Sequence, residues 1–545
     1  MFVIRGCLCT CRPPLLYTSP LNNTLNSSSV PYNSTLTSRH FTSKPRFLIP
    51  SIDHNKTAIK DPSGDHSFEK LSQLSTVITD YVRATSVRGA RVALLMPPCM
   101  QFAAAMIGVM NANCVPVPLN HLATDDELEY VLNNSEVSVV LTSPETDGII
   151  DDGVNNLCVG GDEGQGVESN VCYEDLIGGI MVYTSGTTGR PKGVLSGCIA
   201  FKQWTSALAG AWQITSEDSI LHTLPLYHIH GIMGIFSVLS VGGTVDLRTR
   251  FEAGEVWNAF LSDTPPSLFY GVPTQYSKLI SHYNSHLTGR ADEVKERAAR
   301  LRLMVSGSAP LRDSVSERWE DITGHRILER YGMTEVGMVI SNPYEPVSAR
   351  RPGCIGLPLS GVQARIMGED GEVVAGAEDG RLVSGKEGVP GEIQIAGPTL
   401  FNQYYNRKEE TEESFTSDGW FKTGDTAEID GGVFRILGRT GTDIIKSGGY
   451  KLSALEIERT LLDHEHIVEV AVIGVQDETW GERVVAVLET DLEGLETAGL
   501  RGWCKGRMSG YKVPKDFVVV EALPRNHMGK VNKKALIAKY SAVLR

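Results

Sequence analysis

From residue 92 onward, short apolar segments alternate with segments that have the length and periodicity of helices. One helix-like segment, QFAAAMIGVMNA, lies between the apolar segments VALLMP and CVPVPLN, and VSVVLTS follows. The alternation returns through GTVDL, SLFYGVP and LRLMVSGSAP. Short strands separated by helices of about a dozen residues form βαβ units, whose strands pair in parallel. The pattern therefore predicts an α/β fold whose mostly parallel sheets are flanked by helices.

A smaller second unit begins near residue 438 and contains the helix-like segment ALEIERTLLDH and the strand-like segments VEVAVIGV and DFVVVEAL. We therefore expect a large N-terminal domain at residues 55–437 and a small α+β C-terminal domain at residues 438–545. A short connector should join them, with a hinge between Gly441 and Asp443. The Gly- and acid-rich residues 368–391 are expected to form an irregular loop between two strands.

The first 52 residues differ in composition from the rest of the chain. No Asp or Glu occurs before Asp53, whereas the segment carries five Arg and Lys residues and many Ser, Thr and Asn. An N-terminus that is rich in Arg and Ser and lacks acids is typical of an organelle transit peptide. We expect residues 1–45 to be such a peptide. We favour the mitochondrial matrix as its address, with a plastid as the second organelle and a disordered tail as the alternative.

Charge and hydropathy exclude two classes of protein. Lys and Arg number 51 and Asp and Glu number 65, so the formal net charge at pH 7 is −14. A nucleic-acid-binding protein would instead need a broad basic face. The longest apolar run, residues 102–110, has nine residues, whereas a membrane-spanning helix needs about 20. We therefore expect neither a nucleic-acid partner nor an integral membrane segment.

A loop rich in glycine and hydroxyl groups, YTSGTTGRPKG, spans residues 183–193. Its three glycines allow the backbone to approach an anion closely, four hydroxyls can donate to phosphate oxygens, and Arg190 and Lys192 add positive charge. The loop does not satisfy the Walker A pattern, and its alternative interpretation is a flexible turn after the strand IMVYT. The residues expected to bind phosphate are Thr184, Ser185, Gly186, Thr187, Thr188, Gly189 and Lys192.

Four further motifs follow this loop in order: YGMTE at residues 331–335, GWFKTGD at 419–425, GR at 438–439 and PRNHMGK at 524–530. Together the five motifs resemble those of the adenylate-forming superfamily, which includes acyl-CoA synthetases, luciferases and the adenylation domains of peptide synthetases. The resemblance covers the chain from about residue 55 to the C-terminus. It implies a large AMP- and acyl-binding domain followed by a small mobile domain.

The resemblance also implies how adenine and phosphate are bound. Tyr331 offers a flat face on which adenine can stack, Thr334 can donate to the α-phosphate, and Glu335 is an oxygen ligand suited to the Mg²⁺ that accompanies ATP. In the alternative interpretation, Tyr331 is a core aromatic residue and Glu335 a solvated charge. The other residues expected around the adenine are Gly307, Ser308, Ala309, Gly332 and Met333.

Residues near and beyond the expected domain boundary complete the implied site. Asp425 and Arg439 would reach the ribose hydroxyls, and Lys530 would stabilise the charge that develops on the carboxylate and the α-phosphate. Taken alone, Asp425 is typical of a turn cap and Lys530 of a surface lysine. CoA is the expected co-substrate, and its channel is expected to be lined by Lys446, Ser447, Gly448 and Gly449.

Two arginines suggest that the acyl substrate carries a second negative charge. The segment LPLYHIHG resembles the loop that gates the acyl channel in relatives, and its His228 is the candidate contact for the substrate carboxylate. Arg302 and Arg350 occupy places where they would face the acyl pocket, and burying an unpaired guanidinium is costly. We therefore expect these arginines to bind the distal carboxylate of malonate. The alternative is that both form ordinary salt bridges.

The motifs as a set are most similar to those of organellar malonyl-CoA synthetases. The resemblance implies an ATP-dependent acid–thiol ligase that forms malonyl-CoA from malonate, ATP and CoA through malonyl-AMP. Its catalytic residues would be Lys530, His228, Thr334 and Glu335. The alternatives are a ligase for methylmalonate or for a short- or medium-chain monocarboxylic acid and, in a different class, a non-catalytic nucleotide-binding regulator.

Overall fold

The computed structural model describes residues 53–143, 146, 156–158, 179–184, 190–492, 495–525 and 531–543. The expected transit peptide at residues 1–45 lies outside these ranges, as do Ser185, Gly186, Thr187, Thr188, Gly189 and Lys530. Within the described ranges, no helix has both the length and the hydropathy that crossing a membrane requires.

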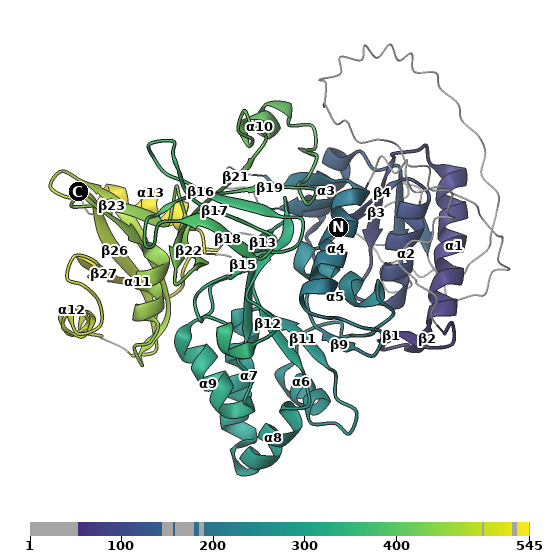
Figure 1. The fold of residues 1–545 in the computed structure, drawn as a ribbon, viewed down its shortest axis with the longest axis horizontal. Coiled ribbons are helices and arrows are strands. Elements are labelled where there is room, and N and C mark those ends of the chain that lie inside the picture. Colours follow the sequence, from purple (N-terminus) through teal and green to yellow (C-terminus); the bar gives the residue numbers. More distant parts are fainter. Residues whose placement is uncertain are drawn as a thin grey trace, which may run out of the picture. The chain divides into compact units, whose positions relative to one another are not determined.

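A nine-stranded sheet forms the centre of the large domain, and neighbouring strands from β1 to β13 run parallel (Figure 1). Antiparallel strands complete both of its edges. In spatial order the strands are β15 (Leu357–Pro358), β14 (Gly337–Ser341), β13 (Leu328–Met333), β12 (Leu303–Ser306), β11 (Leu268–Gly271), β9 (Ser219–His222), β10 (Thr244–Leu247), β1 (Thr57–Asp61) and β2 (Gly64–Ser67). The α/β class predicted from the sequence is confirmed.

Helices cover both faces of this sheet, and its central strands are therefore apolar throughout. Tyr270 and Val305 point into one buried cluster, whereas Phe269 and Met304 point into a second cluster on the opposite face. The first face is covered by α4 (Cys198–Ala211) and α5 (Ile229–Leu239). The second is covered by α6 (Ala253–Phe260), α7 (Pro273–His286), α8 (Ala291–Ala298) and α9 (Asp313–Thr323). Two short 3₁₀ helices are η2 (Thr288–Arg290) and η3 (Val347–Ala349).

A second, fully parallel sheet lies toward the N-terminal side of the chain. Its strands, in spatial order, are β4 (Val115–Pro118), β3 (Arg91–Leu95), β5 (Val139–Thr142) and β6 (Asn156–Cys158). The accompanying helices are α1 (Phe68–Thr85), α2 (Met100–Asn111) and α3 (Asp125–Ser135). A capping box between Thr124 and Glu127 begins α3 and satisfies two backbone N–H groups at its first turn.

Two further sheets carry the motifs that flank the expected nucleotide site. A three-stranded sheet contains β20 (Gln403–Tyr404), β8 (Lys192–Ser196) and β7 (Ile180–Thr184). A six-stranded antiparallel sheet contains β18 (Arg381–Gly385), β17 (Val373–Glu378), β16 (Gln363–Met367), β19 (Gly391–Ala396), β21 (Phe421–Asp430) and β22 (Val433–Arg439). The short helix α10 (Lys408–Glu413) follows β20.

The expectation of an irregular loop at residues 368–391 is wrong. This stretch contains β17 and β18, which pair antiparallel as a hairpin. Its two-residue turn is formed by Asp379 and Gly380, with φ angles of +46° and +75°. Such an Asp-Gly turn is a strong hairpin signal. The exposed outer strand β18 lacks an apolar face, which is why its sequence resembles that of a loop.

The small domain is a five-stranded sheet with three helices. Its strands are β24 (Tyr450–Ser453), β23 (Ile444–Ser447), β26 (Gly481–Thr490), β25 (Ile467–Asp477) and β27 (Asp516–Val519). Its helices are α11 (Ala454–Leu461), α12 (Thr497–Lys505) and α13 (Lys533–Val543). Residues 440–443 connect it to β22 and include the positions where a hinge is expected.

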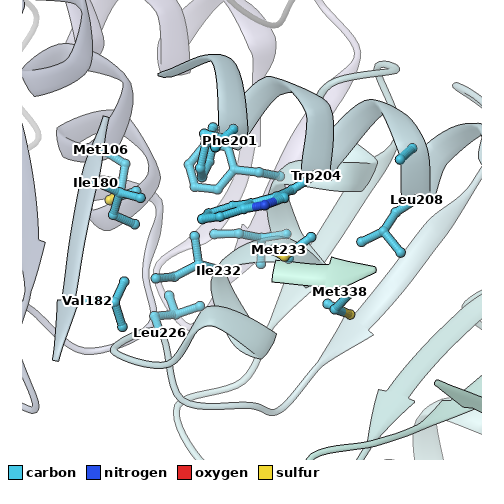
Figure 2. Close-up of a cluster of buried hydrophobic side chains, with 14 of the residues drawn as sticks. Met106, Ile180, Val182, Phe201, Trp204, Leu208, Leu226, Ile232, Met233 and Met338 are labelled. Carbon is cyan, nitrogen blue, oxygen red and sulfur yellow. The ribbon is translucent and has the colours of Figure 1, made fainter. Parts of the chain in front are cut away.

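Figure 2 shows a buried hydrophobic cluster that includes Trp204 of α4, Met233 and Met338. The cluster packs beside the YGMTE motif and fixes the backbone there. The indole Nε1 of Trp204 donates to the carbonyl oxygen of Thr399 at 2.8 Å. Gly337 begins β14 with φ +74°, and a Cβ at this position would lie 2.6 Å from the indole ring. Trp204 therefore packs directly on the turn that holds Thr334 and Glu335.

A buried lysine ties the connector to the core of the small domain. The Lys533 Nζ lies 2.5 Å from a carboxylate oxygen of Asp443 and 2.6 Å from one of Glu458. All three side chains are at most 13% exposed. Burial alone would lower the pKa of Lys533, but the two carboxylates outweigh this effect and raise it. Lys533 therefore stays charged and compensates two buried anions.

Replacing Lys533 with Met should destabilise the small domain by about 3–5 kcal/mol, because removing one partner of a buried ion pair leaves its counterion uncompensated. The matched control is Lys539→Met on the exposed side of α13, which should change stability by less than about 0.5 kcal/mol. Hydrogen exchange of the β25 and β26 amides would measure both effects. Equal protection in the two variants would show that the triad adds no stability.

Candidate active site

The two described ends of the hydroxyl-rich loop lie opposite each other. Thr184 is the last residue of β7 and pairs in register with Lys192, the first residue of β8. The intervening Ser185–Gly189 segment is outside the described residues. The Lys192 ammonium forms an ion pair with Glu410 of α10 and lies 4.9 Å from the centre of the Tyr404 ring. The hairpin thus places Lys192 beside a carboxylate and an aromatic face.

The carboxyl ends of β12 and β13 bring the two predicted adenine segments together. Gly307 follows β12, and Ser308 adopts a left-handed conformation with φ +68°. Tyr331, Gly332 and Met333 end β13, which runs parallel to β12. A Cβ at Gly332 would lie 2.1 Å from the carbonyl oxygen of Gly337, so only glycine fits there. Ligands of open α/β sheets bind at this edge of the strands.

Asp425 and Arg439, the predicted ribose contacts, form a direct pair. They are opposite each other in the register of β21 and β22, and the Arg439 Nε lies 3.1 Å from Asp425 Oδ1. The Tyr331 hydroxyl donates to the other oxygen of Asp425 at 2.5 Å. Burial raises the pKa of Asp425, and the charge of Arg439 opposes this shift. The adenine and ribose candidates therefore share one hydrogen-bonded network.

Glu335, the predicted metal ligand, is buried in the turn after β13. One of its carboxylate oxygens accepts a hydrogen bond from the Tyr404 hydroxyl at 2.9 Å. Burial raises the pKa of Glu335, while the positive charges of Arg439 and Lys192 act in the opposite direction. The described residues contain no cluster of three or more acidic, His or Cys side chains that could hold a metal ion. One carboxylate suits Mg²⁺ that is carried mainly by phosphate oxygens.

The predicted carboxylate contact, His228, lines a cavity of about 810 Å³. The same cavity is lined by Thr184 of the hydroxyl-rich loop and by side chains of α3. His228 is the N-cap residue of α5. The next histidine, His230, is buried, and its Nδ1 lies 3.1 Å from the Ser308 hydroxyl. Thr184 and His228 therefore face a shared space large enough for a small ligand.

Arg302 does not point to a free substrate site. Its guanidinium forms two hydrogen bonds with the carboxylate of Asp218, at 2.7 and 2.6 Å. The remaining donors reach the carbonyl oxygens of Trp212 and Gln213 at 3.0 and 3.2 Å. Each nitrogen of the guanidinium already has a protein partner, so the structure favours the alternative interpretation of Arg302 as one half of an ordinary salt bridge.

Arg350 is also engaged by the protein, although its partners are carbonyl groups. It is buried, and it donates to the carbonyl oxygens of Arg326, Pro343 and Tyr344 at 2.6, 3.1 and 2.7 Å. These bonds hold the segment before β13 to the segment after β14. The sequence led us to expect that Arg350 binds the substrate carboxylate. As with Arg302, the protein already occupies the donors of its guanidinium. We assign Arg350 a structural role.

Arg330 is the cation that sequence reasoning missed. It directly precedes Tyr331 in β13 and is 5% exposed, and its Nε and Nη2 have no hydrogen-bond partner in the described part of the chain. A Cβ at Gly307 would lie 2.5 Å from its guanidinium carbon, so the guanidinium lies against the adenine segment. Burial lowers the pKa of Arg330 to about 9. The available signal was a pair of charged residues, Glu329 and Arg330, inside the strand LERYGM.

The predicted CoA segment forms a tight turn between β23 and β24. Lys446 and Ser447 end β23, while Gly448 and Gly449 adopt φ angles of +57° and +84°. Lys446 is exposed, and its Nζ lies 3.3 Å from a carboxylate oxygen of Glu369. A Cβ at Gly448 would approach the exposed Trp480 ring to 3.1 Å. The glycines thus keep the turn open beside a flat aromatic side chain that the sequence analysis did not single out.

Sequence comparison identifies the family of the chain. The pattern of the AMP-binding enzyme family matches residues 52–405, and the pattern of the AMP-binding enzyme C-terminal domain matches residues 456–530. The chain belongs to the AMP-binding enzyme family. It is 40% identical over 532 residues to the malonate–CoA ligase ACSF3, mitochondrial, of Xenopus laevis, with 91% of this chain and 92% of that protein covered.

Other relatives extend the similarity to plants and to solved structures. A malonate–CoA ligase of Arabidopsis thaliana is 36% identical, with 83% of this chain and 78% of that protein covered. The crystal structure of ATP-bound MatB from Rhodopseudomonas palustris has a TM-score of 0.78 and 30% identity, with 92% of this chain and 98% of that chain covered. The enzyme is therefore an AMP-forming acyl-CoA synthetase.

The close backbone contact at Gly332 gives a direct test of the site. Gly332→Ala should lower the melting temperature and weaken AMP binding at least tenfold, or about 1.4 kcal/mol, because the new Cβ displaces Tyr331 and the turn after it. Gly210→Ala on α4 is the matched control. Nothing lies within 4 Å of its Cβ position, and this change should stabilise the helix by about 0.5–1 kcal/mol. AMP affinity that is equal in both variants would contradict the proposed nucleotide position.

Proposed function

We propose that the enzyme is a malonate–CoA ligase that forms malonyl-CoA from malonate, ATP and CoA. Relatives named malonate–CoA ligase match at 36–40% identity over most of the chain. The observation in the protein that carries the proposal is Arg330. It is a buried guanidinium, without an anionic partner among the described residues, beside the predicted nucleotide segments.

A buried, unpaired guanidinium is costly unless a ligand supplies the missing anion. At neutral pH Arg330 stays charged, since its pKa of about 9 lies well above 7. The neighbouring histidines are neutral under these conditions, because burial lowers the pKa of His222 to about 4 and that of His230 well below its usual value. The buried guanidinium beside Gly307 is therefore a positive charge next to neutral histidines, which suits the distal carboxylate of malonate.

Further polar atoms around Arg330 favour a short polar acid over an alkyl chain. Tyr270 and Arg330 are close enough to influence each other's charge, and a Cβ at Gly234 would contact both Tyr270 and His222. Within the described residues, buried atoms without a hydrogen-bond partner include His222 Nδ1, His230 Nε2, Tyr270 Oη and Ser306 Oγ. An alkyl chain would leave these groups unsatisfied. Methylmalonate carries the same distal carboxylate and remains the nearest alternative.

In the first half-reaction, a malonate carboxylate attacks the α-phosphorus of ATP, an O–P bond forms, and pyrophosphate leaves. We assign Lys192 and the loop hydroxyls to the phosphate oxygens and Asp425 with Arg439 to the ribose. Lys530, which lies outside the described residues, would stabilise the developing charge. Glu335 would hold Mg²⁺, whose charge would offset that of the triphosphate when it is bound.

In the second half-reaction, the CoA thiolate attacks the carbonyl carbon of malonyl-AMP, a thioester bond forms, and AMP leaves. We propose that the small domain rotates about the connector between the two steps, as hinge residues allow in enzymes that use one site for two reactions. The turn formed by Gly448 and Gly449 would then lie along the pantetheine, and the exposed Trp480 would contact CoA.

Arg330→Met removes the charge and keeps most of the side-chain volume. It should lower kcat/KM for malonate by about 10³–10⁴-fold, because a site built to pair a polar group rejects a mismatch by up to about that factor. ATP affinity and activity with butyrate should hold steady or rise. The melting temperature of the ligand-free enzyme should rise as well, because a buried charge is replaced by an apolar group.

Pyrophosphate release measured across malonate, methylmalonate, butyrate and octanoate would provide this test. The exposed residue Arg318 gives the matched control, Arg318→Met, which should leave the substrate profile unchanged. An equal fall in activity for malonate and butyrate would show that Arg330 supports the fold and does not select the substrate. Nucleotide binding without thioester formation from any acid would instead favour a non-catalytic regulator.

We also propose that the enzyme works in the mitochondrial matrix. The support is the acid-free N-terminal composition and the mitochondrial designation of the Xenopus laevis relative. Residues 1–52 fused to a fluorescent protein should direct it to mitochondria, and changing the five basic residues of this segment to Gln should abolish import. A plastid signal in a plant or algal host would contradict the proposed address.

A further inference from the structure

The phosphate-binding candidate Lys192 is already paired in the ligand-free enzyme. Its ammonium donates to Oε1 of Glu410, and the two side chains are 12% and 31% exposed. Glu410 comes from α10, more than 200 residues later in the chain. The partner of Lys192 is therefore brought in by the fold and is not a chance neighbour on the same strand.

The pair belongs to a larger set of charges around Tyr404. The second oxygen of Glu410 accepts from Arg407 at 3.2 Å. Tyr404 presents its ring to Lys192 and its hydroxyl to Glu335. Burial raises the pKa of Glu410, but the bonds to Lys192 and Arg407 outweigh this effect and lower it. Glu410 is therefore ionised at neutral pH, and two cations here are balanced by two carboxylates.

We propose that Glu410 is a positioning residue that takes the place of nucleotide phosphate on Lys192 in the ligand-free enzyme and releases the lysine when the triphosphate binds. The inference rests on the proposed function, in which Lys192 pairs with phosphate oxygens. Lys192 has three donors, but its side chain is 12% exposed and its ammonium contacts Glu410 and the Tyr404 ring. A triphosphate must therefore compete with Glu410 for it.

This competition affects both ATP binding and pyrophosphate release in the first half-reaction. On binding, ATP has to displace a carboxylate, which weakens its affinity. On product release, Glu410 returns to Lys192 as pyrophosphate departs, which speeds departure. Glu410 thus weakens phosphate binding and speeds turnover. Tighter binding of substrate and transition state alike would gain nothing once the site is saturated.

Glu410→Gln removes the charge and keeps the shape of the side chain. In the full-length enzyme, the Kd for ATP and that for pyrophosphate should both fall by about 3–10-fold, as expected for a partly exposed ion pair that no longer competes. Adenosine, which has no phosphate, should bind unchanged. The gain should shrink as ionic strength rises, because salt screens exposed charges. Calorimetric titrations of the three ligands at 50 and 500 mM salt would measure these effects.

The matched control is Glu409→Gln on the adjacent, exposed position of α10, which should leave all three dissociation constants unchanged. In a Lys192→Met background, Glu410→Gln should lose its effect on ATP. Glu410→Asp retains the charge with a shorter reach and should fall between the parent enzyme and the Gln variant. If Glu410→Gln is poorly folded, Glu410→Asp replaces it in the test. Tighter pyrophosphate binding by Glu410→Asp than by the parent enzyme would then support competition between Glu410 and phosphate for Lys192.

Weaker ATP binding in Glu410→Gln, or binding equal to that of Glu409→Gln, would overturn the inference and show that Glu410 merely supports the loop. An effect that persists without the Lys192 ammonium would also overturn it. Failure of the parent enzyme to bind ATP at all would overturn the proposed function instead. The two failures are therefore distinguishable in one series of titrations.

Discussion

Arg439 joins the nucleotide site to the connector, and most of the arrangement described above depends on its contacts. Its side chain pairs with Asp425 and donates to the carbonyl oxygen of Thr423. Its backbone N–H donates to Asp443, which in turn is held by Lys533. An unbroken series of polar contacts thus runs from the ribose candidate through the connector into the small domain. A movement of the connector must change at least one of these contacts.

Burial makes these contacts specific. Glu335, Asp425 and Arg330 lie within the large domain, where an uncompensated charge is costly. Each carboxylate has a tyrosine hydroxyl as donor, Tyr404 for Glu335 and Tyr331 for Asp425. The tyrosines therefore orient the carboxylates before any ligand arrives, and orientation in advance is what lets a site stabilise charge that develops during reaction.

Periodicity was sufficient to predict the parallel sheet. That Tyr331, Asp425 and Arg439 serve one nucleotide was implied by the resemblance of the ordered motifs, and the structure brings the three side chains into contact from two different sheets. The sequence could not show that the donors of Arg302 and Arg350, the arginines expected at the acyl pocket, are occupied by protein partners. Whether a guanidinium is free depends on partners distant in sequence, such as Asp218 for Arg302, and no local pattern reveals them. The hairpin at β17 and β18 was missed because only its Asp-Gly turn signals it.

The arginines and lysines around the site differ in their partners within the protein. These partners determine whether each side chain can bind a ligand anion. Arg302 pairs with Asp218, and Arg350 donates to carbonyl oxygens, so both side chains stabilise the fold. Lys192 and Arg439 have single carboxylates that face the expected phosphate and ribose, so a nucleotide must share or displace these partners. The Nε and Nη2 of Arg330 have no hydrogen-bond partner among the described residues. A ligand anion gains most where it completes a charge and least where it must replace one. Under the proposed function, the acyl end of the site would therefore select its substrate more strictly than the phosphate end.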